Sequence, residues 1–221
     1  MRVVALLAQK GGAGKTSLAL ALAVEAGSAG QTVVVLDADP QASACRWRDR
    51  REAPAPVVTD VHPSRLPHAV EAAAAQGVDL AVIDTPPRSE SAALEAARAA
   101  DLTVVPCRPQ ILDLETIPAA QQLIALAGNP PAVVVLNAVA PRGPRTKQAR
   151  RAIAGFGLPV CPHTLGHRAA WGDAGSLGLT VTEYQRRGLA ADEARRVGQW
   201  LMEALVRPEL LQGVSEDAEK A

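Results

Sequence analysis

Residues 8–17 read Ala-Gln-Lys-Gly-Gly-Ala-Gly-Lys-Thr-Ser and follow directly on a short apolar run, residues 3–7. This order predicts a buried strand, a glycine-rich loop and the first turn of a helix. Gly11, Gly12 and Gly14 let the backbone turn tightly and point its N–H groups inward. The helix adds the positive end of its dipole at the same point. The stretch therefore predicts a cradle for the phosphates of a nucleotide.

Two side chains of this loop suit a nucleotide triphosphate with Mg²⁺. Lys15 supplies a mobile cation, and Thr16 supplies a hydroxyl that can ligate the metal. The common pattern G-x-x-x-x-G-K-S/T has a glycine where Gln9 stands here, and a second lysine, Lys10, follows it. A glycine-rich turn with two solvated lysines is the simpler interpretation, but strand, loop, lysine, threonine and helix arrive in the order that a phosphate site needs.

Short apolar runs alternate with alanine-rich helical stretches along the chain, which predicts a doubly wound α/β fold with a mostly parallel sheet and helices on both faces. The predicted strands are 3–7, 33–36, 80–83, 102–105 and 133–136, with a weaker one at 57–58. The predicted helices are 16–27, 41–52, 66–76, 90–99, 113–127, 145–155 and about 190–206, and Gly27, Gly77 and Gly128 stand where C-caps are expected. We expect one domain over residues 1–211 and a frayed acidic tail over residues 212–221.

Composition narrows the class of protein. The formal net charge is zero, so any affinity for nucleic acid must come from local patches. Aromatic residues make up 2% of the chain, which argues against reading single strands by stacking. Cys45, Cys107 and Cys161 lack C-x-x-C spacing and are expected to be small buried hydrophobes. No apolar stretch is long enough to span a bilayer, and we expect a cytoplasmic protein.

Carboxylates stand at the ends of two predicted strands. Asp37 and Asp39 follow the run 33–36, and Asp84 follows the run 80–83. A carboxylate at the tip of a buried strand needs a partner, and a Mg²⁺–triphosphate complex is one. The alternative is that each aspartate caps the helix that follows it. Since the carboxyl ends of parallel strands meet at one edge of the sheet, convergence beside the glycine-rich loop favours the metal site.

These motifs together resemble the ParA/MinD family of ATPases, whose deviant Walker A box reads K-G-G-x-G-K-S/T. The resemblance runs from Met1 to about Met202 and is strongest to small ParA proteins without an N-terminal helix-turn-helix domain. The residues that carry it, besides the loop, are Asp37–Gln41 as D-x-D-P-Q, the run Asp39–Trp47, Pro106–Pro109 with Asp113, and Arg168, Ser176 and Tyr184.

The resemblance implies roles for individual residues. Lys10, Lys15 and Asp39 would be catalytic: Lys10 reaches the phosphates bound by a partner subunit, and Asp39 orients the attacking water. Thr16, Asp37 and Asp84 would hold Mg²⁺. Asn137 would read adenine, although a turn-forming asparagine is an open alternative. The residues expected to bind ATP are Lys10, Gly11, Gly12, Ala13, Gly14, Lys15, Thr16, Ser17 and Asn137.

The resemblance also implies how such a protein works. It would form a homodimer with ATP, bind double-stranded DNA non-specifically, and hydrolyse ATP slowly until a ParB-like centromere-binding or cargo-adaptor protein stimulates it. Plasmid or chromosome partition over the nucleoid is the leading interpretation. The expected DNA contacts are Arg168, Lys147 and Arg151, and no arginine finger is evident from the sequence.

Three further kinds of family member remain possible. A MinD-type membrane ATPase ends in a basic amphipathic helix, whereas residues 214–221 are acidic here, so a membrane partner is not expected. A positioning ATPase for a protein cargo, such as a carboxysome or a receptor cluster, shares the mechanism and differs only in cargo. Among metabolic relatives, iron-protein reductases need paired cysteines, which the scattered cysteines do not offer. A ligase resembling dethiobiotin synthetase needs a pocket for an acid substrate, which the sequence does not identify.

Overall fold

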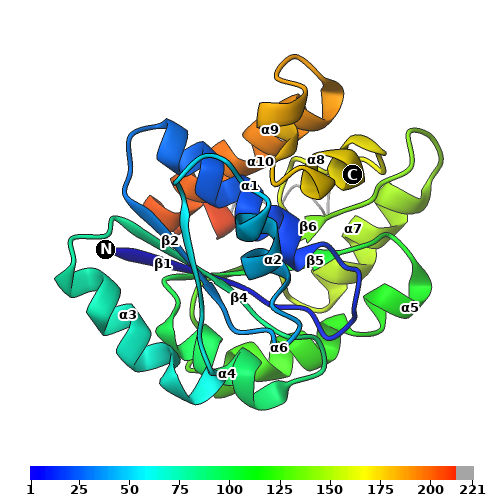
Figure 1. The fold of residues 1–221 in the computed structure, drawn as a ribbon. Coiled ribbons are helices and arrows are strands. Elements are labelled where there is room, and N and C mark those ends of the chain that lie inside the picture. Colours follow the sequence, from blue (N-terminus) through cyan, green and yellow to red (C-terminus); the bar gives the residue numbers. More distant parts are fainter. Residues whose placement is uncertain (213–221) are drawn as a thin grey trace.

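The computed structural model describes residues 1–212 and contains one six-stranded sheet in the order β3-β2-β4-β1-β5-β6 (Figure 1). Every pairing between these strands is parallel. This confirms the predicted fold class, including the weak strand near residue 57. The strands are β1 Arg2–Leu6, β2 Val33–Asp37, β3 Val57–Asp60, β4 Leu80–Asp84, β5 Leu102–Cys107 and β6 Ala132–Leu136.

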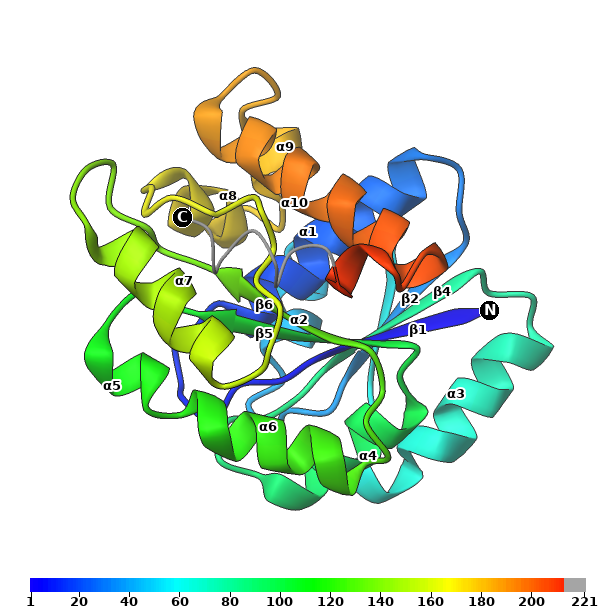
Figure 2. The same cartoon turned by 180° about the vertical axis from the view of Figure 1, so that it is seen from behind.

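Helices cover both faces of the sheet, as Figures 1 and 2 show from opposite sides. On one face lie α1 Lys15–Ser28, α2 Ser43–Asp49 and α10 Leu189–Val206, with the short α8 Ala170–Ser176 and α9 Val181–Tyr184 beyond them. The other face carries α3 Leu66–Ala75, α4 Glu90–Ala99, α6 Ile117–Leu126 and α7 Arg145–Gly155. The remaining short helices are η1 Pro63–Arg65 and α5 Ile111–Leu114.

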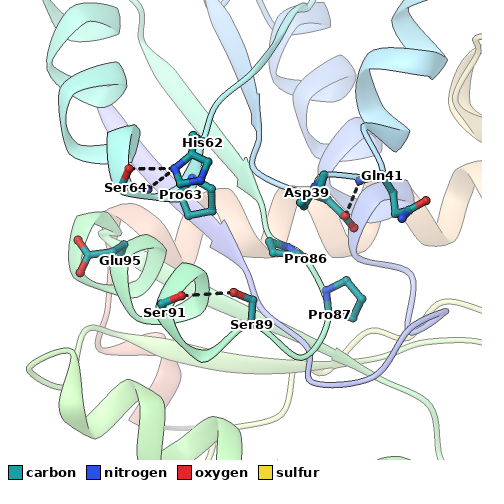
Figure 3. Close-up of a pocket in the computed structure, with 11 residues that line it drawn as sticks. Asp39, Gln41, His62, Pro63, Ser64, Pro86, Pro87, Ser89, Ser91 and Glu95 are labelled. Carbon is teal, nitrogen blue, oxygen red and sulfur yellow. Dashed lines mark hydrogen bonds between the residues drawn. The ribbon is translucent and has the colours of Figure 1, made fainter.

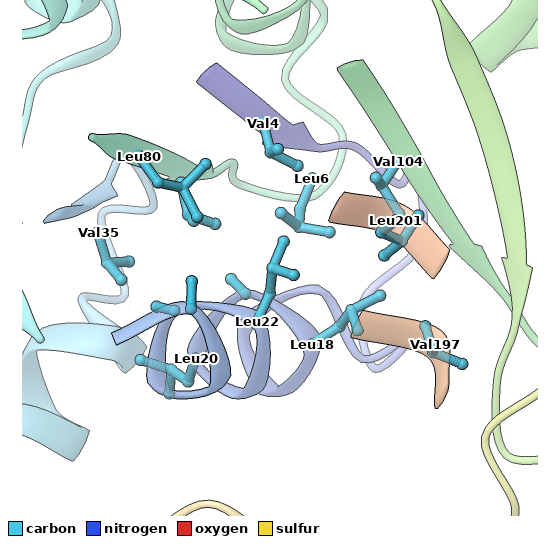
Figure 4. Close-up of a cluster of buried hydrophobic side chains, with 14 of the residues drawn as sticks. Val4, Leu6, Leu18, Leu20, Leu22, Val35, Leu80, Val104, Val197 and Leu201 are labelled. Carbon is cyan, nitrogen blue, oxygen red and sulfur yellow. The ribbon is translucent and has the colours of Figure 1, made fainter. Parts of the chain in front are cut away.

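Alternate side chains of each strand supply two separate hydrophobic cores. Val4 and Leu6 of β1 pack with α1 and α10, and Figure 4 shows them facing Leu22 and Leu201. Val3 of the same strand belongs to the cluster on the opposite face. Because both faces are buried, the strands read as continuous apolar runs. The sheet is therefore fixed on both sides, and its carboxyl edge is a rigid platform for the loops that follow.

Several predicted boundaries differ from the structure. The expected helix 113–127 is two helices, α5 and α6, and Pro118 lies in the first turn of α6, where the missing N–H costs nothing. The expected helix 41–52 is the shorter α2. Gly27 lies inside α1 rather than at its cap, because the helix continues to Ser28.

Residues 165–185 had no predicted element, yet they form α8 and α9 beside α2. The indole Nε1 of Trp47 donates to the Leu179 carbonyl at 3.0 Å, and Arg51 forms an ion pair with Glu183 at 2.7 Å. These contacts tie the helix after β2 to a segment 132 residues further along the chain. Across residues 1–212, no helix has the length and apolarity needed to cross a membrane.

Candidate nucleotide and magnesium site

The glycine-rich loop joins β1 to α1 and is in contact with Asn137, the residue that follows β6. Gly14 has φ +95°, the left-handed region that glycine adopts without strain. The amide of Asn137 lies where a Cβ on Gly14 would stand, and its Nδ2 donates to the Ala13 carbonyl at 2.7 Å. Any side chain at position 14 would therefore clash with Asn137. The sequence left the role of Asn137 open, and the structure gives it a bracing contact to the loop.

Lys15 is buried in a cavity of about 370 Å³ that the loop, Thr16 and Ser17 line. Burial lowers the pKa of its ammonium, while the attraction of Asp84 and Asp39 raises it. A cation that has already lost most of its water interacts strongly with an anion that enters the same cavity. The phosphate-binding role of Lys15 stays a prediction, and its burial in this cavity supports it.

Asp84 and Thr16 offer oxygen atoms that suit Mg²⁺. The Thr16 hydroxyl donates to Asp84 Oδ2 at 2.6 Å, and Oδ1 of Asp84 is buried with no hydrogen-bond partner among the described residues. Burial raises the pKa of Asp84 to about 7. An unpartnered buried carboxylate oxygen is costly, and a hard cation would satisfy it. The residues present therefore fit the metal, and they would hold it through the Thr16 hydroxyl and the Asp84 carboxylate.

We expect Asp84→Asn to stabilise the protein in the absence of nucleotide and metal. Between the unfolded pKa of about 4 and the folded pKa of about 7, the unfolded chain loses a proton that the folded chain keeps, so the free energy of unfolding falls as pH rises. Asparagine removes this penalty. The melting temperature in EDTA should rise by on the order of 5 °C at about pH 8 and change little at about pH 4.

Asp60→Asn is the matched control, because Asp60 lies at the exposed end of β3 on the same edge. The variant at position 84 should also lose the stabilisation that Mg²⁺ and ATP give the wild-type protein. An equal gain in melting temperature at both pH values would contradict the buried-carboxylate explanation.

Asp37 has a different environment from Asp84. Its Oδ2 accepts N–H bonds from Ala44 at 2.9 Å and Cys45 at 3.0 Å, and its Oδ1 accepts the Asp39 N–H at 3.2 Å. The helix-capping alternative therefore describes what Asp37 does here: it fixes the start of α2. A metal role for Asp37 stays a prediction.

Asp39 stands between two cavities. It lines the 370 Å³ cavity with Lys15 and also a cavity of about 760 Å³ on its other side. Figure 3 shows Asp39 beside Gln41, whose backbone N–H donates to Asp39 Oδ1 at 2.9 Å, with Pro86 and Pro87 nearby. The side chain is thereby held in the wall of the cavity that contains Lys15. This position suits the predicted water-orienting role.

Lys10 forms an ion pair with Asp113, an acidic residue that was not predicted to be part of the site. Its Nζ is 3.3 Å from Oδ2 of Asp113, which is almost fully buried. Arg108 also donates to Asp113, with Nε 3.0 Å from Oδ1. Asp113 follows β5, so the rule that strand ends converge could have found it. Lys10 thus has a defined position outside the phosphate cavity.

A third cavity, of about 270 Å³, opens beside Gly12, Gly14 and Ser17 and is also lined by Asn137 and Trp171. It adjoins the phosphate cavity, with which it shares the three loop residues. Its mixed polar and aromatic wall suits a nucleotide base. The adenine-reading role of Asn137 stays a prediction, since both ends of its amide bind backbone groups, Ala13 and Ala138.

The predicted DNA contacts lie in different surroundings. Lys147 and Arg151 are exposed on α7. Arg168 instead forms a two-bond ion pair with Glu193 of α10, with Nη2 2.6 Å from Oε1, and lines the third cavity. The Arg168 guanidinium is therefore already paired with a carboxylate, and its replacement would also disturb α10. Lys147 is exposed, so its replacement tests DNA binding more directly.

The cysteines match their predicted character. Cys45, Cys107 and Cys161 are all buried and unpaired, and burial raises the pKa of each thiol. Within residues 1–212, no cluster of three or more histidine, cysteine or acidic residues is arranged to hold a metal ion. The described chain therefore offers no cysteine pair for an iron–sulfur cluster.

Comparison with known proteins places this site among nucleotide-binding domains. Residues 4–181 match the family described as the CobQ/CobB/MinD/ParA nucleotide binding domain. The maintenance of carboxysome distribution protein A of Gloeobacter kilaueensis is 35% identical over 206 residues, covering 90% of this chain and 94% of that protein. Protein ParA of Rhizobium radiobacter is 32% identical over 127 residues, 57% of each chain. The septum site-determining protein MinD of Pyrococcus horikoshii, solved with Mg-ADP, has the same fold, with a TM-score of 0.72, 17% identity, and coverage of 90% and 95%.

Proposed function

Because this chain belongs to the CobQ/CobB/MinD/ParA nucleotide-binding family, we propose that it is a positioning ATPase of the ParA type. It binds ATP with Mg²⁺, dimerises in the ATP-bound state, associates with double-stranded DNA without sequence preference, and hydrolyses ATP slowly until a partner protein stimulates it. Its cargo is a protein assembly, carried through an adaptor.

One observation carries the ATPase proposal: Lys15, Thr16 and Asp39 line one cavity, and the buried Asp84 lies directly behind it, hydrogen-bonded to Thr16. The loop N–H groups and Lys15 bind the phosphates. Thr16 and Asp84 would hold Mg²⁺, which would neutralise phosphate charge. Asp39 orients the attacking water. Catalysis then rests on positioning and charge, the two terms that dominate phosphoryl transfer.

The ion pair between Lys10 and Asp113 supports dimerisation through Lys10. In the single chain, this half-buried lysine rests on a carboxylate outside the phosphate cavity. Arg108 pairs with the same carboxylate, so the buried Asp113 keeps a cationic partner when Lys10 moves away. Lys10 leaves Asp113 when the phosphates of a second subunit come within reach, so that ATP joins the two copies.

A protein cargo is supported by the relatives. The protein from Gloeobacter kilaueensis distributes carboxysomes, according to its name, and it matches 90% of this chain. Plasmid partition is the second candidate, favoured by the match to ParA over 57% of the chain. This order reverses the leading interpretation from the sequence, because the more complete match is to a protein named for cargo distribution.

A ligase and a membrane ATPase have less support. A ligase needs room for a second substrate, and the 760 Å³ cavity beside Asp39 has the carboxylates of Asp39 and Glu95 in its wall. These two carboxylates would repel a carboxylate substrate, which disfavours a ligase. The acidic residues 214–221, on which the argument against a membrane helix rests, lie outside the described residues.

Lys10→Ala should keep ATP binding but lose both the ATP-dependent dimer and DNA binding. Pairing two copies doubles the exposed basic surface of α7, and each phosphate contact adds about one unit to the dependence of affinity on salt. Light scattering measures the dimer, and DNA titrations at several salt concentrations with ATP, ADP and no nucleotide measure binding.

Lys147→Glu should weaken DNA binding across all sequences while ATP hydrolysis without DNA stays unchanged. Arg65→Glu makes the same charge change beside β3, at the opposite edge of the sheet from β6, and should have no effect. Equal DNA binding with ATP, with ADP and without nucleotide would contradict the proposal that ATP controls DNA binding. Binding to lipid vesicles in ATP, with none to DNA, would favour a membrane ATPase.

A further inference from the structure

An arginine at the end of α2 lines the same cavity as the glycine-rich loop. The walls of the 370 Å³ cavity include loop residues between Gly11 and Ser17 and also Trp47, Arg50 and Gly175. Arg50 is the C-cap of α2, the helix that begins just after Asp39. The cavity that receives the phosphates is therefore bounded by a guanidinium as well as by Lys15.

The charge of Arg50 has no carboxylate partner in the described part of the chain. Several arginines fall close together on this helix and just after it: Arg46, Arg48, Arg50 and Arg51. Arg48 pairs with Asp49 and Arg51 with Glu183. Arg50 instead donates from Nε and Nη2 to the Gly175 carbonyl, at 3.3 and 3.1 Å. This leaves a full positive charge, and the N–H groups of Nη1, beside the cavity.

Neighbouring contacts fix the backbone on both sides of Arg50, whose exposed guanidinium is held by its two bonds to the Gly175 carbonyl. Trp47 donates to Leu179, and Arg51 donates to the Gly178 carbonyl at 3.1 Å, so α2 is bound to the segment 175–183 on both sides of Arg50. A Cβ on Gly178 would lie 2.6 Å from the Arg51 nitrogen, which shows how closely the two backbones pack. A cation held in place before the ligand arrives gives up little conformational entropy on binding.

We propose that Arg50 binds the phosphates of the nucleotide from the part of the cavity wall that α2 and α8 form. This inference rests on the ATPase function proposed above and adds a second cation, from the same chain, that sequence analysis did not find. Guanidinium binds phosphate oxygens through charge-assisted hydrogen bonds. Because Arg50 also holds the Gly175 carbonyl, the same residue connects the bound nucleotide to α8.

Arg50→Gln tests the role of the charge. Glutamine can still donate to the Gly175 carbonyl, so it keeps the bridge between α2 and α8 but removes the positive charge. We expect it to weaken binding of Mg-ADP by about 10-fold or more, as expected for loss of a hydrogen bond to a charged group. Binding of inorganic triphosphate should weaken by a similar factor. Calorimetry measures both, and the loss should shrink as salt concentration rises.

Arg46→Gln is the matched control, because Arg46 lies on the same helix and is exposed like Arg50 but does not line the cavity. It should bind both ligands as the wild-type protein does, and Arg50→Lys should lie between wild type and Arg50→Gln. A loss for Mg-ADP without a loss for triphosphate would overturn the proposal, since a structural or base contact would explain it.

Lys15→Ala in the same experiment separates two kinds of failure. If Lys15→Ala abolishes binding while Arg50→Gln binds like the wild type, the role of Arg50 is wrong and the nucleotide site stands. If neither variant affects binding, the proposed ATPase function fails and this inference fails with it. Melting curves without ligand confirm that each variant is folded.

Discussion

Lys15→Ala is expected to abolish binding of Mg-ATP, a loss of at least about 100-fold in affinity. Lys15 is 6% exposed and lies near Asp84 and Asp39. Alanine removes the buried cation and leaves two carboxylates facing an incoming polyanion. Lys10, the other lysine of the loop, is engaged with Asp113 and does not replace it. Calorimetric titration of ATP in the presence of Mg²⁺ measures the effect.

Lys147→Ala is the control for this experiment, because it removes a lysine from the exposed face of α7 and should leave ATP affinity unchanged. A melting curve of the Lys15 variant without ligand tests whether the fold is kept. Equal affinity for ATP in the wild type and in Lys15→Ala would show that the glycine-rich loop is not a phosphate site.

Asp39→Ala should bind ATP but hydrolyse it about 100-fold or more slowly, and ATP-bound dimers should accumulate. Asp39 lines the cavity that contains Lys15 but is not part of the glycine-rich loop, so its loss removes the group proposed to orient water and spares the groups proposed to bind phosphate. Steady-state phosphate release and light scattering with ATP measure the two outcomes.

Asp39→Asn separates charge from local structure, because asparagine can still accept the Gln41 N–H that fixes this turn. It should be as slow as Asp39→Ala. Glu95→Ala removes another carboxylate from the 760 Å³ cavity, away from the loop, and should hydrolyse ATP normally. Hydrolysis at the wild-type rate in Asp39→Asn would contradict the water-orienting role.

Confirmation of the proposed cargo needs a different kind of evidence from the site chemistry. The nucleotide site is compatible with plasmid partition and with distribution of a protein assembly, since both use the same ATP-dependent switch. The relatives favour the protein assembly, because the match to the carboxysome distribution protein covers more of the chain. Identification of the protein that stimulates hydrolysis would decide between the two.

The sequence by itself determined the sheet, because its strands are buried on both faces and therefore read as unbroken apolar runs. It also located the glycine-rich loop, since glycines, lysine and threonine at fixed spacing reflect backbone geometry that a few neighbouring residues specify. Asp84 was found for a related reason: a carboxylate directly after an apolar strand must lie at the carboxyl edge of a parallel sheet.

The tertiary structure decided what each of these groups touches. Asp37 and Asp84 end neighbouring strands in register, yet one caps α2 while the other keeps an unpartnered oxygen beside Thr16. The pairing of Lys10 with Asp113 joins residues 103 positions apart. Arg50 reaches the phosphate cavity only because α2 packs against residues 175–183. Such contacts join residues that are far apart in the sequence and meet only when the helices pack on the sheet. The local periodicity of the sequence carries no information about them.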